Sequence, residues 1–135
     1  EPIANIKVEK VDNKFKVIFE VSDTEKKKRI NELLTVIKDG FYAQSSGEAN
    51  TIVPLFIIAA PVKIPTPVFH PYIDIEEIKE TKSYCVKGIS DCLENSWRDG
   101  NVFIMESEKV ELKEELKDII KEWADFLREC GIKND

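Results

Sequence analysis

The chain has 135 residues, of which 20 are Lys or Arg and 26 are Asp or Glu, so its net charge is −6. This length suits one domain, and a hydrophobic content of 42% can supply a core. The composition excludes collagen-like and low-complexity chains, and no apolar run reaches the roughly 20 residues that a membrane span needs. A sequence pI near 5.0 excludes a protein that coats nucleic acid with uniform positive charge.

The charge is unevenly distributed along the chain. Residues 1–70 carry ten basic and nine acidic side chains, whereas residues 71–135 carry ten basic and seventeen acidic ones. The first half also holds a basic cluster, Lys26, Lys27, Lys28 and Arg29. A local groove for nucleic acid in the first half is therefore compatible with an acidic total.

The cysteine usage indicates a reducing compartment. Three cysteines, at positions 85, 92 and 130, are too few for a disulfide framework, so we expect free thiols in the cytoplasm. No secretory signal opens the chain, and the missing initiator Met suits a processed form or part of a longer protein. Abundant Lys, Glu and Ile are typical of a thermophile.

The first elements are a hairpin and a helix. Residues 3–11 and 14–21 predict two strands joined at Asp12-Asn13, and the alternation in 14–21 predicts a half-buried strand. Ser22 and Glu25 form a capping box, and an apolar face at helical spacing predicts a helix over 24–39 that ends at Gly40.

The middle of the chain predicts a loop and a central strand. Residues 42–51 are small and polar and indicate a loop, and the apolar run Ile52–Ala60 predicts a strand buried on both faces. Pro54 is awkward for such a strand because it cannot donate to the ladder. The proline-rich stretch Pro61–Tyr72 predicts an extended path.

The acidic half completes an α+β order. It predicts a short helix over 75–82, a strand over 83–89, a helix over 90–97, a strand over 102–105 and a long amphipathic helix over 108–130. We expect one domain over 1–135, with sheet, helix and a candidate binding loop in 1–73 and the acidic region ending in the long helix in 74–135. The leading architecture is an RRM-like or ferredoxin-like antiparallel sheet with helices on one face.

Catalytic and metal chemistry find little support in the sequence. The single histidine, His70, and the three cysteines lack the close ligand pairs of structural zinc sites, so we expect no metal and no cofactor. No nucleophile elbow accompanies His70, and we expect no enzyme with a complete active site on this chain.

Two segments could contact a phosphate backbone. Residues 45–51 offer small side chains and free backbone N–H groups, although a plain surface loop is the competing interpretation. The cluster Lys26–Arg29 sits where the helix dipole disfavours cations, which an anionic partner would offset; a solvated helix face is the alternative. The aromatic residues Phe41, Tyr42 and Phe69 could stack on bases.

The segment 29–72 carries a family resemblance. It contains Asp39-Gly40-Phe41, then Ser45-Ser46-Gly47-Glu48-Ala49-Asn50-Thr51, then a strand entered through Pro54 and the stretch Pro65-Thr66-Pro67-Val68-Phe69. This order resembles the DevR-like backbone subunit of type I CRISPR Cascade complexes, of the RAMP superfamily. The acidic second half and the short chain depart from that family, which suggests a C-terminal portion or a trimmed form.

The resemblance implies a modified RRM-type fold and a subunit without a catalytic role. It implies partners, namely CRISPR RNA held by its backbone without regard to sequence, other Cascade subunits and copies of the chain in a filament. The RNA-binding candidates are Lys26, Lys27, Lys28, Arg29, Ser45, Ser46, Gly47 and Asn50. The alternatives are a protein-interaction domain that binds no nucleic acid and a small enzyme whose site is shared between subunits.

Overall fold

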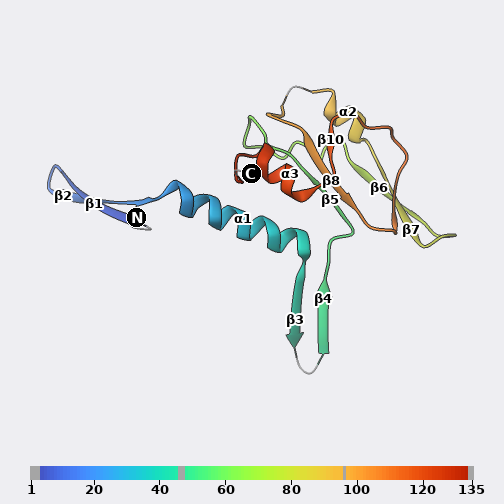
Figure 1. Cartoon of the computed structure of the whole chain (residues 1–135), viewed down its shortest axis with the longest axis horizontal. Coiled ribbons are helices and arrows are strands. Elements are labelled where there is room, and N and C mark those ends of the chain that lie inside the picture. Colours follow the sequence, from blue (N-terminus) through green and yellow to red (C-terminus); the bar gives the residue numbers. More distant parts are fainter. Residues whose placement is uncertain (1–3, 46–47, 96, 134–135) are drawn as a thin grey trace.

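The computed structural model describes residues 4–45, 48–95 and 97–133, with the side chains of 42–50 outside the description. It divides into an extended arm, residues 4–53, and a compact body, residues 54–133 (Figure 1). In the arm, the hairpin β1–β2 leads into a long helix, α1, and a second hairpin, β3–β4, leaves the far end of that helix. The α+β class predicted from the sequence is confirmed, in a form compatible with an RRM-like or ferredoxin-like chain.

The first hairpin follows the sequence prediction closely. Strands β1 (Ala4–Val11) and β2 (Lys14–Val21) pair antiparallel, and Asp12 adopts a positive φ of 56° in the turn. One face is mostly apolar and the other holds most of the lysines and glutamates, because residues paired directly across the strands share a face. The half-burial expected for β2 is wrong, since Phe15 is 71% exposed and Phe19 is 69% exposed.

The helix α1 (Asp23–Asp39) begins and ends as predicted. The Ser22 hydroxyl accepts a hydrogen bond from the Glu25 N–H at 3.3 Å, which is one half of the predicted capping box. The other half is not found among the described hydrogen bonds, because Glu25 Oε1 accepts from Arg29 Nε at 2.9 Å instead. At the other end Gly40 has a φ of 87° and donates its N–H to the Val36 carbonyl, and a Cβ there would collide with the Ile52 carbonyl. The apolar face of α1 has no buried residue; Leu33, for example, is 62% exposed.

The loop predicted over 42–51 is wrong. Strands β3 (Phe41–Ser45) and β4 (Glu48–Ile52) pair antiparallel from Phe41 opposite Ile52 to Ser45 opposite Glu48. Small polar residues can form this hairpin because its backbone groups bond to each other and no core is needed to hold them.

The body contains two three-stranded sheets. The first has the order β10–β8–β5, from Ile119–Ile120, Val102–Glu106 and Phe56–Ala59; β8 pairs antiparallel with β5 and parallel with β10. The second has the order β6–β7–β9, from Asp74–Ile78, Ser83–Lys87 and Val110–Leu112. The short helices α2 (Ile89–Leu93) and α3 (Trp123–Glu129) complete the body.

The central strand β8 divides the core into two layers. Val102 and Ile104 point into a cluster with Ile89, Cys92 and Trp97, whereas Phe103 faces the other way, with ring centroids 5.1 Å from Trp123 and 5.3 Å from Phe126. Phe103 is 1% exposed. The body is therefore packed on both sides of one sheet, and the arm meets it where the Lys38 ammonium lies 5.7 Å from the Trp123 ring.

Three predicted elements of the body are wrong. The strand expected over Ile52–Ala60 to be central is only β5, which begins after Pro54 and lies at the edge of its sheet. The helix expected over 75–82 is strand β6 and a turn. The long helix expected over 108–130 is two short strands followed by α3, because residues 110–112 pair with β7 and residues 119–120 pair with β8.

Candidate nucleic-acid interface

The basic cluster Lys26–Arg29 occupies the start of α1. Two of its members are paired along the helix: Arg29 Nε lies 2.9 Å from Glu25 Oε1, and Lys26 Nζ lies 3.6 Å from Asp23 Oδ1. Lys27 and Lys28 form no ion pair with the described residues. The two acids in the first turn therefore offset part of the dipole penalty, and two ammonium groups remain available to an outside anion.

The second predicted group lies at the end of the β3–β4 hairpin. Ser45 is the last residue of β3 and pairs with Glu48, and Asn50 pairs with Ala43. Ser46 and Gly47 lie outside the described residues. The structure thus places the predicted segment at the far end of a hairpin rather than in a loop beside a central strand (Figure 1).

The structure does not bring the two predicted groups together. About 15 Å of helix axis separates Arg29 from Asp39 at ~1.5 Å per residue, and the five-residue strand β3 then adds roughly 16 Å. Figure 1 shows the β3–β4 hairpin leaving the opposite end of α1 from the basic cluster. An RNA that touched both groups would therefore lie along the length of α1, and binding at either group stays a prediction.

The sequence reasoning missed further lysines on the first hairpin. Lys7, Lys14 and Lys16 share the polar face of β1–β2, and all are exposed. Lys7 Nζ lies 2.8 Å from Glu20 Oε1, whereas Lys14 and Lys16 form no ion pair within the described part of the chain. The alternation of lysine with phenylalanine along 14–19 could have revealed this basic face.

The aromatic candidates for base stacking fare differently. Phe69 is partly buried and packs against Trp97 with ring centroids 5.0 Å apart and nearly perpendicular rings, so it contributes to the core of the body. Phe41, at the start of β3, is 52% exposed. The Tyr42 side chain lies outside the described part.

The remaining candidates show no assembled chemistry. Burial raises the pKa of the Cys92 thiol, which donates to the Val68 carbonyl at 3.3 Å, and burial also raises the pKa of Cys130. Among the described residues, no three His, Cys, Asp or Glu side chains are placed to hold one metal ion. Nor does any helix within the described ranges have the length and apolar character to cross a membrane.

Comparison with known proteins identifies a family. Residues 3–83 match the model of the CRISPR-associated negative auto-regulator family DevR/Csa2. No curated protein and no solved structure matches the chain. The match covers both hairpins, α1, β5 and β6, and therefore contains all eight residues predicted for RNA binding. Since the match spans more than half of the sequence, the chain belongs to the DevR/Csa2 family of CRISPR-associated proteins.

Proposed function

We propose that this chain is a backbone subunit of a Cascade-type CRISPR effector complex and that its arm holds the guide RNA by the phosphate backbone. The observation that carries the proposal is the family match, which covers the whole arm. The lysines at positions 14, 16, 27 and 28 support it, because they form no ion pair with the described residues and an ammonium group is a good partner for phosphate.

We assign RNA binding to the arm because the body carries a net negative charge, which repels phosphate. Residues 4–53 carry nine basic and eight acidic side chains, whereas residues 54–133 carry eleven basic and sixteen acidic ones. Contacts to phosphate are independent of base identity, so binding through the arm would be independent of RNA sequence. We assign the chain no catalytic step.

The bare apolar faces of the arm support a role in assembly. Exposed apolar residues gather on the first hairpin and on α1, among them Ile6, Val8, Phe15, Val17, Phe19, Ile30, Leu33, Val36 and Ile37. Patches of this kind mark protein interaction sites. We assign them to contacts with other Cascade subunits, including copies of this chain in a filament along the RNA.

The test replaces the basic cluster and measures the salt dependence of RNA binding. A variant with Lys26, Lys27, Lys28 and Arg29 all changed to Ala should bind single-stranded RNA more weakly. The slope of log K against log salt should become shallower by about 2 to 3, because each phosphate that a cation neutralises accounts for ~0.7 of the slope on a single strand. The matched control changes four exposed body lysines, Lys79, Lys109, Lys113 and Lys121, to Ala and should leave the slope unchanged.

Two outcomes would reject the proposal. An unchanged slope in the cluster variant would remove the cluster from the RNA interface. A wild-type protein that forms stable oligomers and binds no RNA at low salt would instead favour the pure protein-interaction domain.

A further inference from the structure

A polar hollow lies in the body, far from the residues assigned to RNA above. Its volume is about 240 Å³, and its walls come from α2 with the residue that follows it, from Arg98, and from residues 115–118. Known pockets for drug-sized ligands range from roughly 300 to 1,000 Å³, so this hollow suits a smaller group. We call it the Arg98 pocket.

Arg98 lines this pocket and carries a hydrogen-bonding group without a partner among the described residues. Its Nη1 atom is buried and has no hydrogen-bond partner in the described structure. None of the described carboxylates lies within ion-pair distance of its guanidinium. A buried donor without an acceptor costs free energy in the free protein, and a bound acceptor would recover it.

The backbone that carries Arg98 is anchored by hydrogen bonds to a second segment. The backbone of Arg98 bridges Val62, and the flanking Lys63 N–H and Asp99 N–H each donate across this bridge at 2.9 Å, to the Trp97 and Pro61 carbonyls. Trp97 Nε1 also donates to the Cys92 carbonyl at 2.8 Å. The guanidinium is therefore held on a fixed backbone beside α2.

The facing wall is held by one carboxylate. Glu114 accepts hydrogen bonds from the backbone N–H groups of Gly88, Ile89 and Ser90 at 3.0, 3.0 and 3.2 Å. Strand β10 fixes the other end of this segment through the pairing of Ile119 with Val102. The stretch 115–118 between these anchors is thereby positioned before any ligand arrives, which lowers the cost of binding.

The chemistry of the lining is mixed rather than simply acidic or basic. Arg98 and Lys117 supply cationic donors, Glu94, Glu115 and Asp118 supply anionic acceptors, and Leu93 and Leu116 supply apolar surface. Three carboxylates against two cations disfavour a bare phosphate. A flat, neutral group with acceptors on one edge and donors on another matches this lining.

We propose that the Arg98 pocket binds a guanine base. The guanidinium fork pairs with the two acceptors O6 and N7 of guanine, which is the edge that arginine recognises best. The carboxylates of the facing walls accept from the N1–H and the amino group, and the two leucines cover the faces of the ring. Adenine offers one acceptor and one donor on the corresponding edge and leaves Arg98 unsatisfied.

This site goes beyond the proposed function, because it lies on the body and does not require the basic cluster of the arm. The experiment titrates the full chain with guanosine 5′-monophosphate while the methyl NMR signals of Leu93 and Leu116 are followed. Adenosine 5′-monophosphate and inorganic phosphate serve as matched ligands. We expect saturable shifts of both leucines with the guanine nucleotide, at a Kd on the order of 1 mM or tighter, and none with the other two.

Variants distinguish a direct role of the Arg98 guanidinium in binding from an effect on the stability of the protein. Arg98→Gln should weaken binding of the guanine nucleotide by about tenfold, and Arg98→Lys should weaken it too because lysine lacks the fork. Arg128→Gln, on α3 and paired with Asp125, should bind like the wild type. The variant lacking the basic cluster should also bind like the wild type, so a failure of RNA binding and a failure of this site give different results.

Three results would overturn the proposal. Equal affinity for the guanine and adenine nucleotides would show that no base is recognised. Binding that leaves Leu93 and Leu116 unshifted would place it elsewhere. Absence of saturable shifts with guanosine 5′-monophosphate would also overturn it, and loss of oligomers in Arg98→Gln beside that absence would assign the pocket to a side chain of a protein partner.

Discussion

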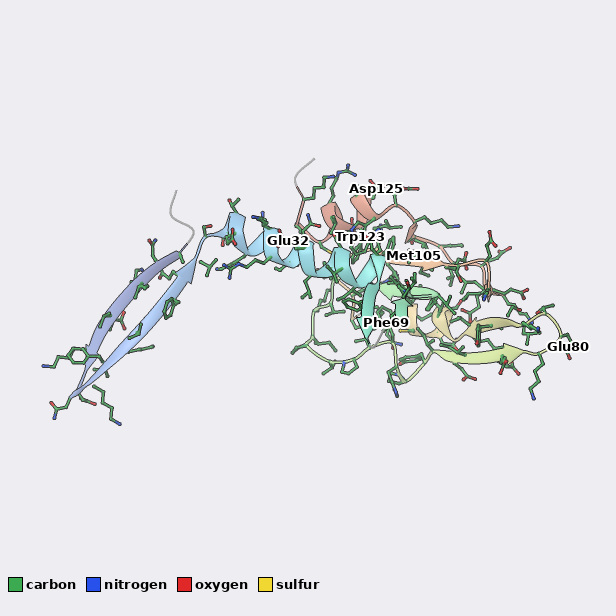
Figure 2. All side chains as sticks on the ribbon, turned by 90° about the horizontal axis from the view of Figure 1, so that it is seen from below. Glu32, Phe69, Glu80, Met105, Trp123 and Asp125 are labelled. Carbon is green, nitrogen blue, oxygen red and sulfur yellow. The ribbon has the colours of Figure 1, made fainter. Side chains whose placement is uncertain are left out.

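The arm and the body of this chain contain similar fractions of apolar residues, but the body buries many of its large apolar side chains and the arm leaves most of its own exposed. In the body, Phe103 and its neighbours are buried on both sides of β8. In the arm, Phe15, Phe19 and Leu33 alternate or recur just as regularly but remain exposed. Figure 2 shows the contrast: side chains crowd around Met105 and Phe69, whereas those of the first hairpin stand apart. Regular spacing of apolar residues therefore predicts a strand or a helix. Whether that strand or helix is buried depends on another part of the protein packing against it.

The largest expected effect on stability compares the loss of one phenylalanine ring from the body with the loss of one from the arm. Phe103→Ala removes a buried ring from contact with Trp123 and Phe126 and should lower the free energy of unfolding by about 3 to 5 kcal/mol. Phe19→Ala, in the exposed face of β2, should change it by less than about 0.5 kcal/mol. Urea denaturation followed by tryptophan fluorescence measures both, and equal losses would contradict the division into body and arm.

The next effect tests how the body is closed. Glu114→Ala leaves three backbone donors at the start of α2 without their acceptor and should cost roughly 2 to 3 kcal/mol by the same measurement. Glu114→Gln keeps one acceptor oxygen and should cost less than Glu114→Ala. If the two variants are equally stable, the carboxylate does not hold residues 114–118 against α2.

A smaller and local effect is expected in the arm. Ser22→Ala removes the cap of α1 and should cost that helix about 1 kcal/mol. Since α1 buries no residue, the amides of its first turns should exchange hydrogen several times faster while the unfolding midpoint of the body stays fixed. Thr24→Ala, in the same turn, is the control. A body that loses stability with Ser22→Ala would show that arm and body unfold together.

The smallest effect concerns an exposed pair in the second sheet. Lys87 donates a hydrogen bond to Glu76 across β6 and β7, and this contact lowers the pKa of Glu76. The pair therefore stabilises the fold at pH values above the pKa that the carboxyl has in the unfolded chain. This stabilisation is lost as the pH falls through the lowered pKa of the folded protein. Lys87→Met should return the Glu76 pKa toward its ordinary value, as read from its carboxyl carbon signal by NMR. Lys79→Met should not, and an unmoved Glu76 in Lys87→Met would rule the pair out.

The sequence predicts the arm well where local chemistry decides the structure. The turn at Asp12, the cap at Ser22 and the stop at Gly40 all depend on neighbours in sequence, and each is present. The β3–β4 hairpin escaped prediction because its small polar residues carry no apolar alternation, although the Ser-Gly pair at its end is a turn signal.

The body could not be read in the same way because its elements depend on distant partners. Residues 108–130 have helical spacing, but the Tyr84 N–H donates to the Lys109 carbonyl and Val110 pairs with Tyr84, so tertiary pairing overrides helix propensity. Asp118, with a φ of 58°, also lies outside the helical conformation. The Arg98 pocket was not predictable either, since it joins residues from three separate segments.

The arm is proposed to hold the phosphate backbone of RNA, whereas the body is proposed to make no contact with the phosphates. Hydrogen exchange of the full chain with and without a single-stranded RNA that contains no guanine tests this most directly, because it reports on every described backbone amide at once. We predict new protection in the first turns of α1 and in the two arm hairpins, with the amides of β6 to β9 unchanged. Protection confined to the body, with the arm exchanging as in the free protein, would contradict the account.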